Sequence, residues 1–388
     1  MANFLITGAR APVALELSRN LAKEGHTVYI ADSLLFPLAK HSKFVKKTFH
    51  ITGPRKSLKQ FKNDLENILI KHDIECLIPT CEEVFYISSI KAALELYTKV
   101  FCPEFNLIKT LHSKYDVYKV AKNSGFYNPN TEMLTGDELI RRKRYIGKVV
   151  KKEFCRFGTD ILIDPTFNDV LNFVGNKFNE KFVIQDKVEG IEYCTYSIVN
   201  KGHVLFSSIY RPKYKIQTGA SIYFKPFINE NISKAVIQFC KNNNVTGQIG
   251  FDVIVNATGI FLLECNPRAT SGVHLLSKNA LADAFLGDGQ FLENNCNLTE
   301  PKTIKLAMLL IGLPFALKKS QLKQFVSDYQ MASDIISVKE DNSFMFFSLL
   351  SLLEICVISL KAGTSFRSAT TFDIEWDGKN LYCNDHYE

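Results

Sequence analysis

Two acidic residues and an asparagine lie within one short segment, and an arginine follows them directly. The segment spans residues 250–276 and contains Asp252, Glu264, Asn266 and Arg268. Carboxylate and amide oxygens are ligands for a hard divalent cation, and a guanidinium binds phosphate through paired hydrogen bonds. If these side chains share one surface, the segment could hold a metal ion together with a phosphate group. The alternative is a surface hairpin whose polar side chains are only solvated.

The apolar residues around this group predict a β-hairpin. Residues 251–255 and 260–263 are rich in β-branched and large aliphatic side chains, and they flank Asn-Ala-Thr-Gly at 256–259. We expect a three-residue loop at 257–259 with Gly259 in the left-handed conformation, so that Asn256 pairs with Ile260.

This register fixes which side chains share a face. Asp252 would lie opposite Glu264, and strand alternation would place Asp252, Glu264 and Asn266 together. The other face would carry five apolar residues: Phe251, Val253, Val255, Phe261 and Leu263. Alternation also places Cys265 on the buried face, where we expect it to pack rather than react.

The first hundred residues alternate between predicted strands and helices, which is typical of a small parallel sheet with helices on both faces. Glu82 and Glu83 follow a strand predicted at 74–79, so they either face a ligand or begin a helix. Gly8 forms a turn compatible with phosphate, and Asp32 follows the second strand as a ribose acceptor would. However, the full G-x-G-x-x-G pattern of a dinucleotide site is missing.

The middle of the chain is predicted to be a compact α+β module followed by antiparallel strands. A strand over 147–152 carries Lys151 and precedes a polar, glycine-containing turn at 156–159. A polar connection over 185–192 leads into strands at 193–199 and 204–210. Arg211 then lies on a basic loop that ends at residues 218–221, and it could hold a substrate carboxylate.

The chain after residue 297 is predicted to be mostly helical, with a final strand over 371–376. Residues 344–360 are strongly apolar, but they are short for a membrane span and contain Glu354. We therefore expect a buried helix or a dimer interface there.

Composition indicates an ordinary globular chain. The 388 residues are 46% hydrophobic and 22% charged, and the net charge of +7 is mild and dispersed. We expect no nucleic-acid or membrane partner. The 10 cysteines include no C-x-x-C pair and no amino-terminal leader pattern is visible, so we expect reduced thiols in the cytoplasm.

The order of these parts resembles the ATP-grasp superfamily, which includes biotin-carboxylase, D-alanine–D-alanine ligase and carbamoyl-phosphate-synthase enzymes. The most specific piece is Glu264-Cys265-Asn266-Pro267-Arg268, preceded in the right order by Lys151, Glu192 and Asp252. The resemblance implies an ATP-grasp fold of mixed α/β and α+β architecture. We divide the chain into an N-terminal Rossmann-like domain (1–110), a lid region (111–190), a central antiparallel domain (191–296) and a mostly helical C-terminal region (297–388).

The resemblance also implies roles for individual residues. Asp252, Glu264 and Asn266 would hold Mg²⁺, with Mn²⁺ as a substitute, and Arg268 would be catalytic, facing the transferred phosphate. Residues 156–159 would form a flexible lid loop. The residues expected to bind ATP are Lys114, Lys151, Gln185, Asp186, Val188 and Glu192. Glu82 and Arg211 are tentative substrate contacts.

The implied activity is that of an ATP-dependent ligase that activates a small-molecule carboxylate as an acyl phosphate and joins it to an amine. A homodimer is a further expectation. Two alternatives remain: an NAD(P)-dependent oxidoreductase built on the N-terminal sheet, and a catalytically silent nucleotide-binding protein.

Overall fold

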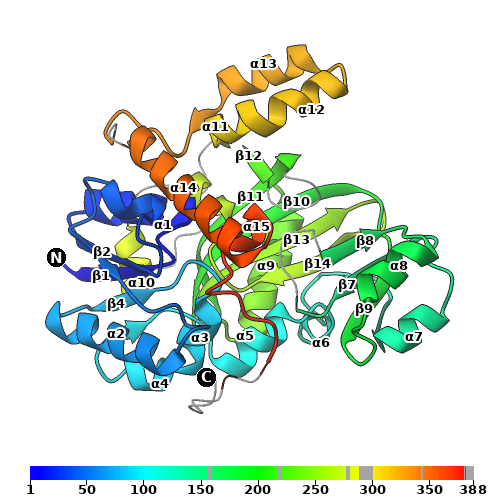
Figure 1. Ribbon diagram of the computed structural model, residues 1–388, viewed down its shortest axis with the longest axis horizontal. Coiled ribbons are helices and arrows are strands. Elements are labelled where there is room, and N and C mark those ends of the chain that lie inside the picture. Colours follow the sequence, from blue (N-terminus) through cyan, green and yellow to red (C-terminus); the bar gives the residue numbers. More distant parts are fainter. Residues whose placement is uncertain are drawn as a thin grey trace.

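The computed structural model describes residues 1–154, 160–215, 221–276, 280–287, 300–341, 344–379 and 381. Their strands form three sheets, of five, four and seven strands. Figure 1 shows the five-stranded sheet at one side of the molecule, the large sheet in the centre and the four-stranded sheet at the other side.

The N-terminal sheet is parallel and has the strand order β3-β2-β1-β4-β5. Its strands are β1 (Asn3–Thr7), β2 (Thr27–Asp32), β3 (Lys47–His50), β4 (Cys76–Ile78) and β5 (Lys99–Val100). The helices of this part are α1 (Pro12–Lys23), α2 (Leu58–Lys71), α3 (Val84–Ser89), α4 (Lys91–Leu94) and α5 (Phe105–His112). The predicted parallel sheet is confirmed, and Ile90 separates α3 from α4.

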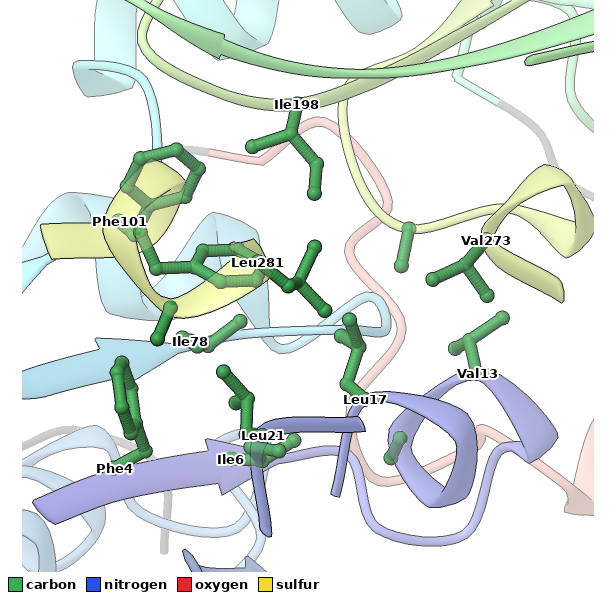
Figure 2. Packing of buried hydrophobic residues seen from close by; sticks show 14 of the residues in the cluster. Phe4, Ile6, Val13, Leu17, Leu21, Ile78, Phe101, Ile198, Val273 and Leu281 are labelled. Carbon is green, nitrogen blue, oxygen red and sulfur yellow. The ribbon is translucent and has the colours of Figure 1, made fainter. Parts of the chain in front are cut away.

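Alternation along β1 explains why helices cover both faces of this sheet. Phe4 and Ile6 pack with α1, whereas Leu5 packs with α2 and α3. Figure 2 shows that the first cluster continues to Ile198 of the central sheet and Leu281 of α10 (Leu281–Leu286). One continuous apolar core therefore fixes the N-terminal sheet against the centre of the molecule.

The four-stranded sheet is antiparallel, in the order β6-β9-β7-β8. Its strands are β6 (Thr131–Thr135), β7 (Lys148–Lys152), β8 (Ile161–Ile163) and β9 (Lys181–Asp186), with helices α7 (Gly136–Arg141) and α8 (Phe167–Val174). Thr135 and Glu138 form a capping box at the start of α7. Between this sheet and α5, the helix α6 covers only Val117–Val120.

The large sheet has the order β14-β13-β10-β11-β12-β15-β16. Its strands are β10 (Ile191–Asn200), β11 (His203–Lys215), β12 (Ser221–Pro226), β13 (Gly247–Val255), β14 (Ile260–Asn266), β15 (Lys302–Thr303) and β16 (Ser333–Asp334). The helix α9 (Glu230–Asn242) packs on one face through Ile232, Val236 and Phe239, which contact Phe251 and Val253 in the same cluster.

The β13–β14 hairpin differs from the prediction at its turn. Val255, not Asn256, pairs with Ile260, so the loop has four residues rather than three. A register shift after Asp252 adds one residue on β14, and it restores the predicted pairing of Asp252 with Glu264. Consequently Leu262 is buried in the core instead of the predicted Phe261 and Leu263, and Phe261 packs on Tyr127.

The C-terminal region is mostly helical, as predicted. Its helices are α11 (Lys305–Ala307), α12 (Leu313–Lys318), α13 (Leu322–Met331), α14 (Phe344–Ala362) and α15 (Phe366–Ala369), and a π-helical turn, η4 (Met308–Gly312), joins α11 to α12. The strand predicted over 371–376 is wrong, because these residues form turns and irregular backbone without a strand partner. Within the described part of the chain, no helix is long and apolar enough to cross a membrane.

Gly259 provides a test of the hairpin geometry. It has a φ of +154°, and a Cβ atom there would lie 2.4 Å from Cε2 of Tyr127. Gly259→Ala should therefore lower the thermal unfolding midpoint by the equivalent of about 1–3 kcal/mol. Gly25→Ala is the control, because Gly25 also has a positive φ (+89°) but a Cβ atom there would meet no other atom within 4 Å. Equal losses in the two variants would contradict the close packing of Tyr127 on the turn.

Candidate active site

A cavity of about 380 Å³ lies where the N-terminal sheet, the central sheet and the C-terminal region meet. The polar residues on its central wall are Asp252, Glu264, Asn266 and Arg268. The remaining lining comes from the loops after β1 and β4, from β10 and β11, and from the C-terminal region; it includes Ala11, Pro12, Val13, Thr80, Cys81, Cys194, Tyr210, Pro212, Ile355, Thr370 and Thr371.

The two acids and the amide share a face, as the sequence predicted. Asn266 Nδ2 lies 3.4 Å from Asp252 Oδ2 and 3.3 Å from Glu264 Oε1. The register shift in β14 makes this possible, because without it Glu264 would move to the opposite face of the strand. The predicted common face is confirmed.

The two carboxylates have opposite pKa shifts. Burial, and then the neighbouring Glu264, raise the pKa of Asp252 above its ordinary range. Burial also opposes the charge of Glu264, but Lys114 overcomes this effect and lowers the pKa of Glu264. A cation between the two carboxylates would favour the charged form of both.

The donor set suits Mg²⁺ or Mn²⁺, because it consists of hard oxygen atoms. No group of three or more His, Cys, Asp or Glu side chains suited to a metal occurs among the residues that the structure describes. A cation would therefore depend on the two carboxylates and on Asn266, whose amide would have to turn Oδ1 toward them in place of Nδ2. Substrate oxygens or water would have to complete its coordination.

Two buried lysines reach the acids from the neighbouring elements. Lys114 is 1% exposed, and its Nζ lies 3.2 Å from Glu264 Oε2. Lys151, on β7, is 4% exposed and donates to the carbonyl oxygen of Leu263 over 3.2 Å. Both lysines predicted to contact phosphate thus lie beside the hairpin, with their charges largely removed from water.

Glu82 binds Arg268. Arg268 Nε donates to Glu82 Oε1 over 2.7 Å, and the guanidinium also lies 3.4 Å from Asn266 Oδ1. Because Glu82 is fully buried, its charge holds the guanidinium at the cavity wall. Glu82 was predicted as a substrate contact, and the structure places it behind the arginine instead.

Glu83 joins the end of β1 to the loop that follows β4. Its Oε1 accepts hydrogen bonds from Thr7 Oγ1 at 2.8 Å and from the backbone N–H groups of Thr80 and Cys81 at 3.0 and 3.2 Å. Burial raises the pKa of Glu83. Of the two acids that follow β4, one therefore orients a site residue and the other shapes the loop.

The residues predicted to bind adenosine lie along β9 and the start of β10. Gln185 is 3% exposed on β9, Asp186 pairs with Lys148, and Val188 is half-buried after the strand. Glu192 forms an ion pair with Lys215. Glu192 lies two residues before Cys194, which pairs with Asp252, so its side chain projects from the same sheet face as the acids.

Arg211 lies apart from the cavity. Its neighbours Tyr210 and Pro212 line the cavity, so alternation along β11 directs Arg211 to the other face. There its guanidinium lies 5.9 Å from the ring of Tyr193. Arg211, which was predicted as a tentative substrate contact, is not among the residues that line this cavity. The predicted lid turn at 156–159 and residues 218–220 lie outside the described residues.

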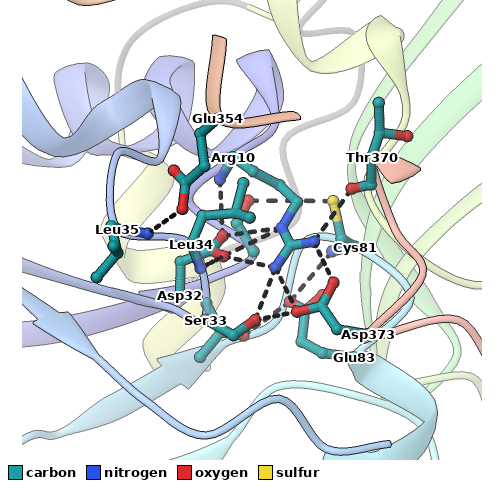
Figure 3. Close-up of polar contacts among 12 residues, drawn as sticks. Arg10, Asp32, Ser33, Leu34, Leu35, Cys81, Glu83, Glu354, Thr370 and Asp373 are labelled. Atoms are coloured by element: carbon teal, nitrogen blue, oxygen red, sulfur yellow. Dashed lines mark hydrogen bonds and ion pairs between the residues drawn. The ribbon is translucent and has the colours of Figure 1, made fainter. Parts of the chain in front are cut away.

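Residues 370–376, which we call the strap, also belong to the site, although the sequence did not indicate this. Arg10 binds the strap, since Nη1 lies 2.7 Å from Asp373 Oδ1 and 3.1 Å from the carbonyl oxygen of Thr370, as Figure 3 shows. The ring of Trp376 stacks on Phe85 with centroids 5.0 Å apart. The strap thereby places Thr370 and Thr371 at the cavity wall.

The same arginine also forms an ion pair with Asp32. Arg10 Nη2 lies 2.7 Å from Asp32 Oδ1, and the backbone N–H of Arg10 donates to Asp32 Oδ2 over 2.9 Å. Asp32 is 3% exposed. The acid that suggested a dinucleotide ribose site therefore serves as the partner of Arg10.

Comparisons with known proteins agree with this architecture. A model of the ATP-grasp domain family matches residues 111–272. Tyramine–L-glutamate ligase of Methanocaldococcus jannaschii is 23% identical over 288 residues, which are 69% of this chain and 83% of the relative.

Two solved structures share the fold at low sequence identity. L-amino acid ligase from Bacillus licheniformis has a TM-score of 0.60 at 11% identity, with 78% of each chain covered. The biotin carboxylase domain dimer of Hydrogenobacter thermophilus 2-oxoglutarate carboxylase, solved with MgADP, ADP and bicarbonate, has a TM-score of 0.59 at 13% identity. Coverage there is 77% of this chain and 73% of the other.

The fold is the one seen in ATP-grasp structures, and the acid-lined hairpin lies within the segment that the ATP-grasp domain model matches. The chain carries an ATP-grasp domain over residues 111–272 within an ATP-grasp fold, and the resemblance found in the sequence is confirmed.

The strap gives a pH-dependent prediction that can be read through the one tryptophan of the chain, Trp376. Although burial opposes its charge, Arg10 lowers the pKa of Asp373. The ion pair should therefore stabilise the docked strap above the ordinary carboxylate pKa, and this contribution should be lost as the pH falls through the lowered pKa. Acidification should shift the emission of Trp376 to longer wavelength.

Asp373→Asn should show that red shift already at neutral pH. Asp377→Asn is the matched control, since Asp377 lies close by in the chain but forms an exposed ion pair with Lys379 at 3.4 Å. Identical emission spectra for Asp373→Asn and the wild type, both at neutral pH and on acidification, would contradict the docking role of Arg10 and Asp373.

Proposed function

We propose that this protein is an ATP-dependent ligase that joins a carboxylate to an amine and releases ADP and phosphate. The observation that carries the proposal is the common face of Asp252, Glu264 and Asn266, with Arg268 beside it at the cavity wall. The similarity to tyramine–L-glutamate ligase supports the same class of reaction.

In this reaction a carboxylate oxygen of the first substrate attacks the γ-phosphorus of ATP, and ADP leaves. The amine then attacks the acyl carbon, a proton leaves the nitrogen, and phosphate departs as the C–N bond forms. Such transfers need positioning and charge compensation more than a protein nucleophile. Cys265 is fully buried in the core, and burial raises the pKa of its thiol, so it suits packing rather than attack.

Residues in and beside the cavity would each have a separate role in this reaction. Asp252, Glu264 and Asn266 would hold Mg²⁺, which supplies compensation of phosphate charge when it is bound. Lys114 and Lys151 would bind phosphate oxygens from the side of the small sheet. Arg268, oriented by Glu82, would stabilise the charge of the group in transfer.

The opposite half of the cavity would receive the two organic substrates. Its wall combines Tyr210 and Pro212 of β11 with Ile355 of α14 and Thr371 of the strap. The C-terminal region would therefore help to exclude water from an acyl phosphate, which water would otherwise hydrolyse. The homodimer and the cytoplasmic location stay predictions.

Asp252→Asn tests the proposed cation site. The change keeps the shape of the side chain and leaves the ion pair of Lys114 with Glu264 intact. We expect Mg²⁺-dependent ADP release, with a panel of amino acids and amines, to fall by about 100-fold or more. Asp137→Asn, in a surface ion pair with Arg141, should retain full activity. Undiminished turnover in Asp252→Asn would remove the cation assignment.

Ligand-induced stabilisation separates the ligase from an oxidoreductase. A ligand that binds the native state raises the thermal unfolding midpoint. We expect ATP with Mg²⁺ to raise the unfolding midpoint. We expect NADPH to leave it unchanged, because the carboxylate of Asp32 is already bound to Arg10 and is not free to accept a ribose hydroxyl. A rise with NADPH alone would reverse the assignment.

A further inference from the structure

The helical hairpin of residues 305–331 projects from the body of the protein (Figure 1). We call it the C-terminal hairpin; it comprises α11, η4, α12 and α13. Its inner side is well partnered. Met308 and Phe325 pack with Tyr214 and Tyr223 of the central sheet, and Asp328 accepts a hydrogen bond from Tyr214 Oη over 2.7 Å. The hairpin is therefore anchored as a defined element.

Its remaining surface is unusually apolar for a face in contact with water. Leu310 is 66% exposed and Leu317 is 58% exposed. Six more large apolar side chains of the hairpin are exposed: Leu306, Leu309, Phe315, Leu322, Val326 and Met331.

The exposed charges of the C-terminal hairpin are all positive. Asp328 is its single acidic residue, and it is 4% exposed and engaged by Lys213 as well as Tyr214. Lys318, Lys319 and Lys323 are all exposed. The water-facing surface of the hairpin thus combines large apolar groups with lysines and has no exposed acid.

The helix α14, which lies in the same upper part of Figure 1, also combines exposed apolar side chains with positive charge. Leu349, Leu353 and Leu360 are exposed at helical spacing. The one acid of α14, Glu354, is engaged, because it accepts hydrogen bonds from the backbone N–H groups of Leu35 and Phe36 at 2.7 and 2.8 Å. The exposed charge of α14 is Lys361.

We propose that the C-terminal hairpin binds the surface of an anionic phospholipid bilayer. Exposed apolar side chains on such a helix enter the boundary between headgroups and acyl chains, while lysines reach the lipid phosphates. The helices lie on the membrane and do not cross it. The sequence predicted no membrane partner, because residues 344–360 are too short for a span and contain Glu354, but binding at the bilayer surface needs no spanning segment.

Charge complementarity favours lipid over a second copy of the chain. In a two-fold symmetric dimer the same patch meets itself, so Lys318, Lys319 and Lys323 would face a partner surface that also carries lysines and no exposed acid. With no exposed acid on the hairpin, that contact would be repulsive. An anionic lipid surface instead attracts each lysine.

Vesicle co-sedimentation of the full-length protein tests the proposal. We expect binding to vesicles of phosphatidylcholine mixed with phosphatidylglycerol, weaker binding at high salt, and little binding to phosphatidylcholine alone. Leu310→Glu with Leu317→Glu should lower the partition coefficient by about tenfold or more, because apolar insertion is lost. Lys318→Glu, Lys319→Glu and Lys323→Glu together should lower it by a similar factor.

The control is a variant in which three lysines outside the C-terminal hairpin are replaced by glutamate, so that the net charge changes by the same amount. Lys56, Lys59 and Lys71 are exposed around α2, at the other side of the molecule in Figure 1, and their triple Glu variant should bind vesicles nearly as the wild type does. Absence of binding by the wild type, or equal loss in the control and hairpin triples, would overturn the proposal. So would leucine-dependent self-association in sedimentation velocity without vesicle binding. ADP release is a separate readout, so failure here leaves the proposed ligase function unaffected.

Discussion

An ion pair between a buried lysine and a half-buried glutamate holds the centre of this protein together. Lys114 is 1% exposed, and its charge is compensated by Glu264 at 3.2 Å. A buried charge without a partner costs several kcal/mol, so this pair ties the segment after α5 to the β13–β14 hairpin. In the proposed reaction Glu264 would help to hold a cation, and the charge of Lys114 would then be available to a phosphate.

The rest of the cavity is built by ion pairs between parts that are distant in the sequence. Arg268 and Glu82 are 186 residues apart, and Arg10 and Asp373 are 363 residues apart. Each pair joins a loop of the N-terminal sheet to a later region and places that region at the cavity. The C-terminal strap is thus part of the wall rather than a separate appendage.

Local patterns predicted much of the fold and the central wall of the site. The parallel sheet and the common face of the acids follow from alternation and spacing within short segments. The turn at Gly259 was predicted wrongly, yet Asp252 still lies opposite Glu264 because a register shift in β14 compensates. Periodicity alone cannot reveal such a shift, since both registers alternate equally well near the turn.

Long-range partners could not be predicted in the same way. Glu82 was expected to contact substrate, but nothing near it in the sequence indicates Arg268. The strap has the apolar alternation of a strand, but a strand needs a neighbouring strand with free hydrogen-bonding groups, and here the strap docks through Asp373 and Trp376 instead. Arg211 is separated from the cavity by a single step of strand alternation, which depends on the observed sheet.

The most direct test of the central claim is a crystal structure of the protein with ADP and Mn²⁺, using the anomalous signal of manganese to locate the ion. The account predicts a peak within about 2.0–2.6 Å of oxygen atoms of Asp252, Glu264 and Asn266, shared with the nucleotide phosphates. A manganese peak away from this face, or a nucleotide whose phosphates lie elsewhere, would contradict it.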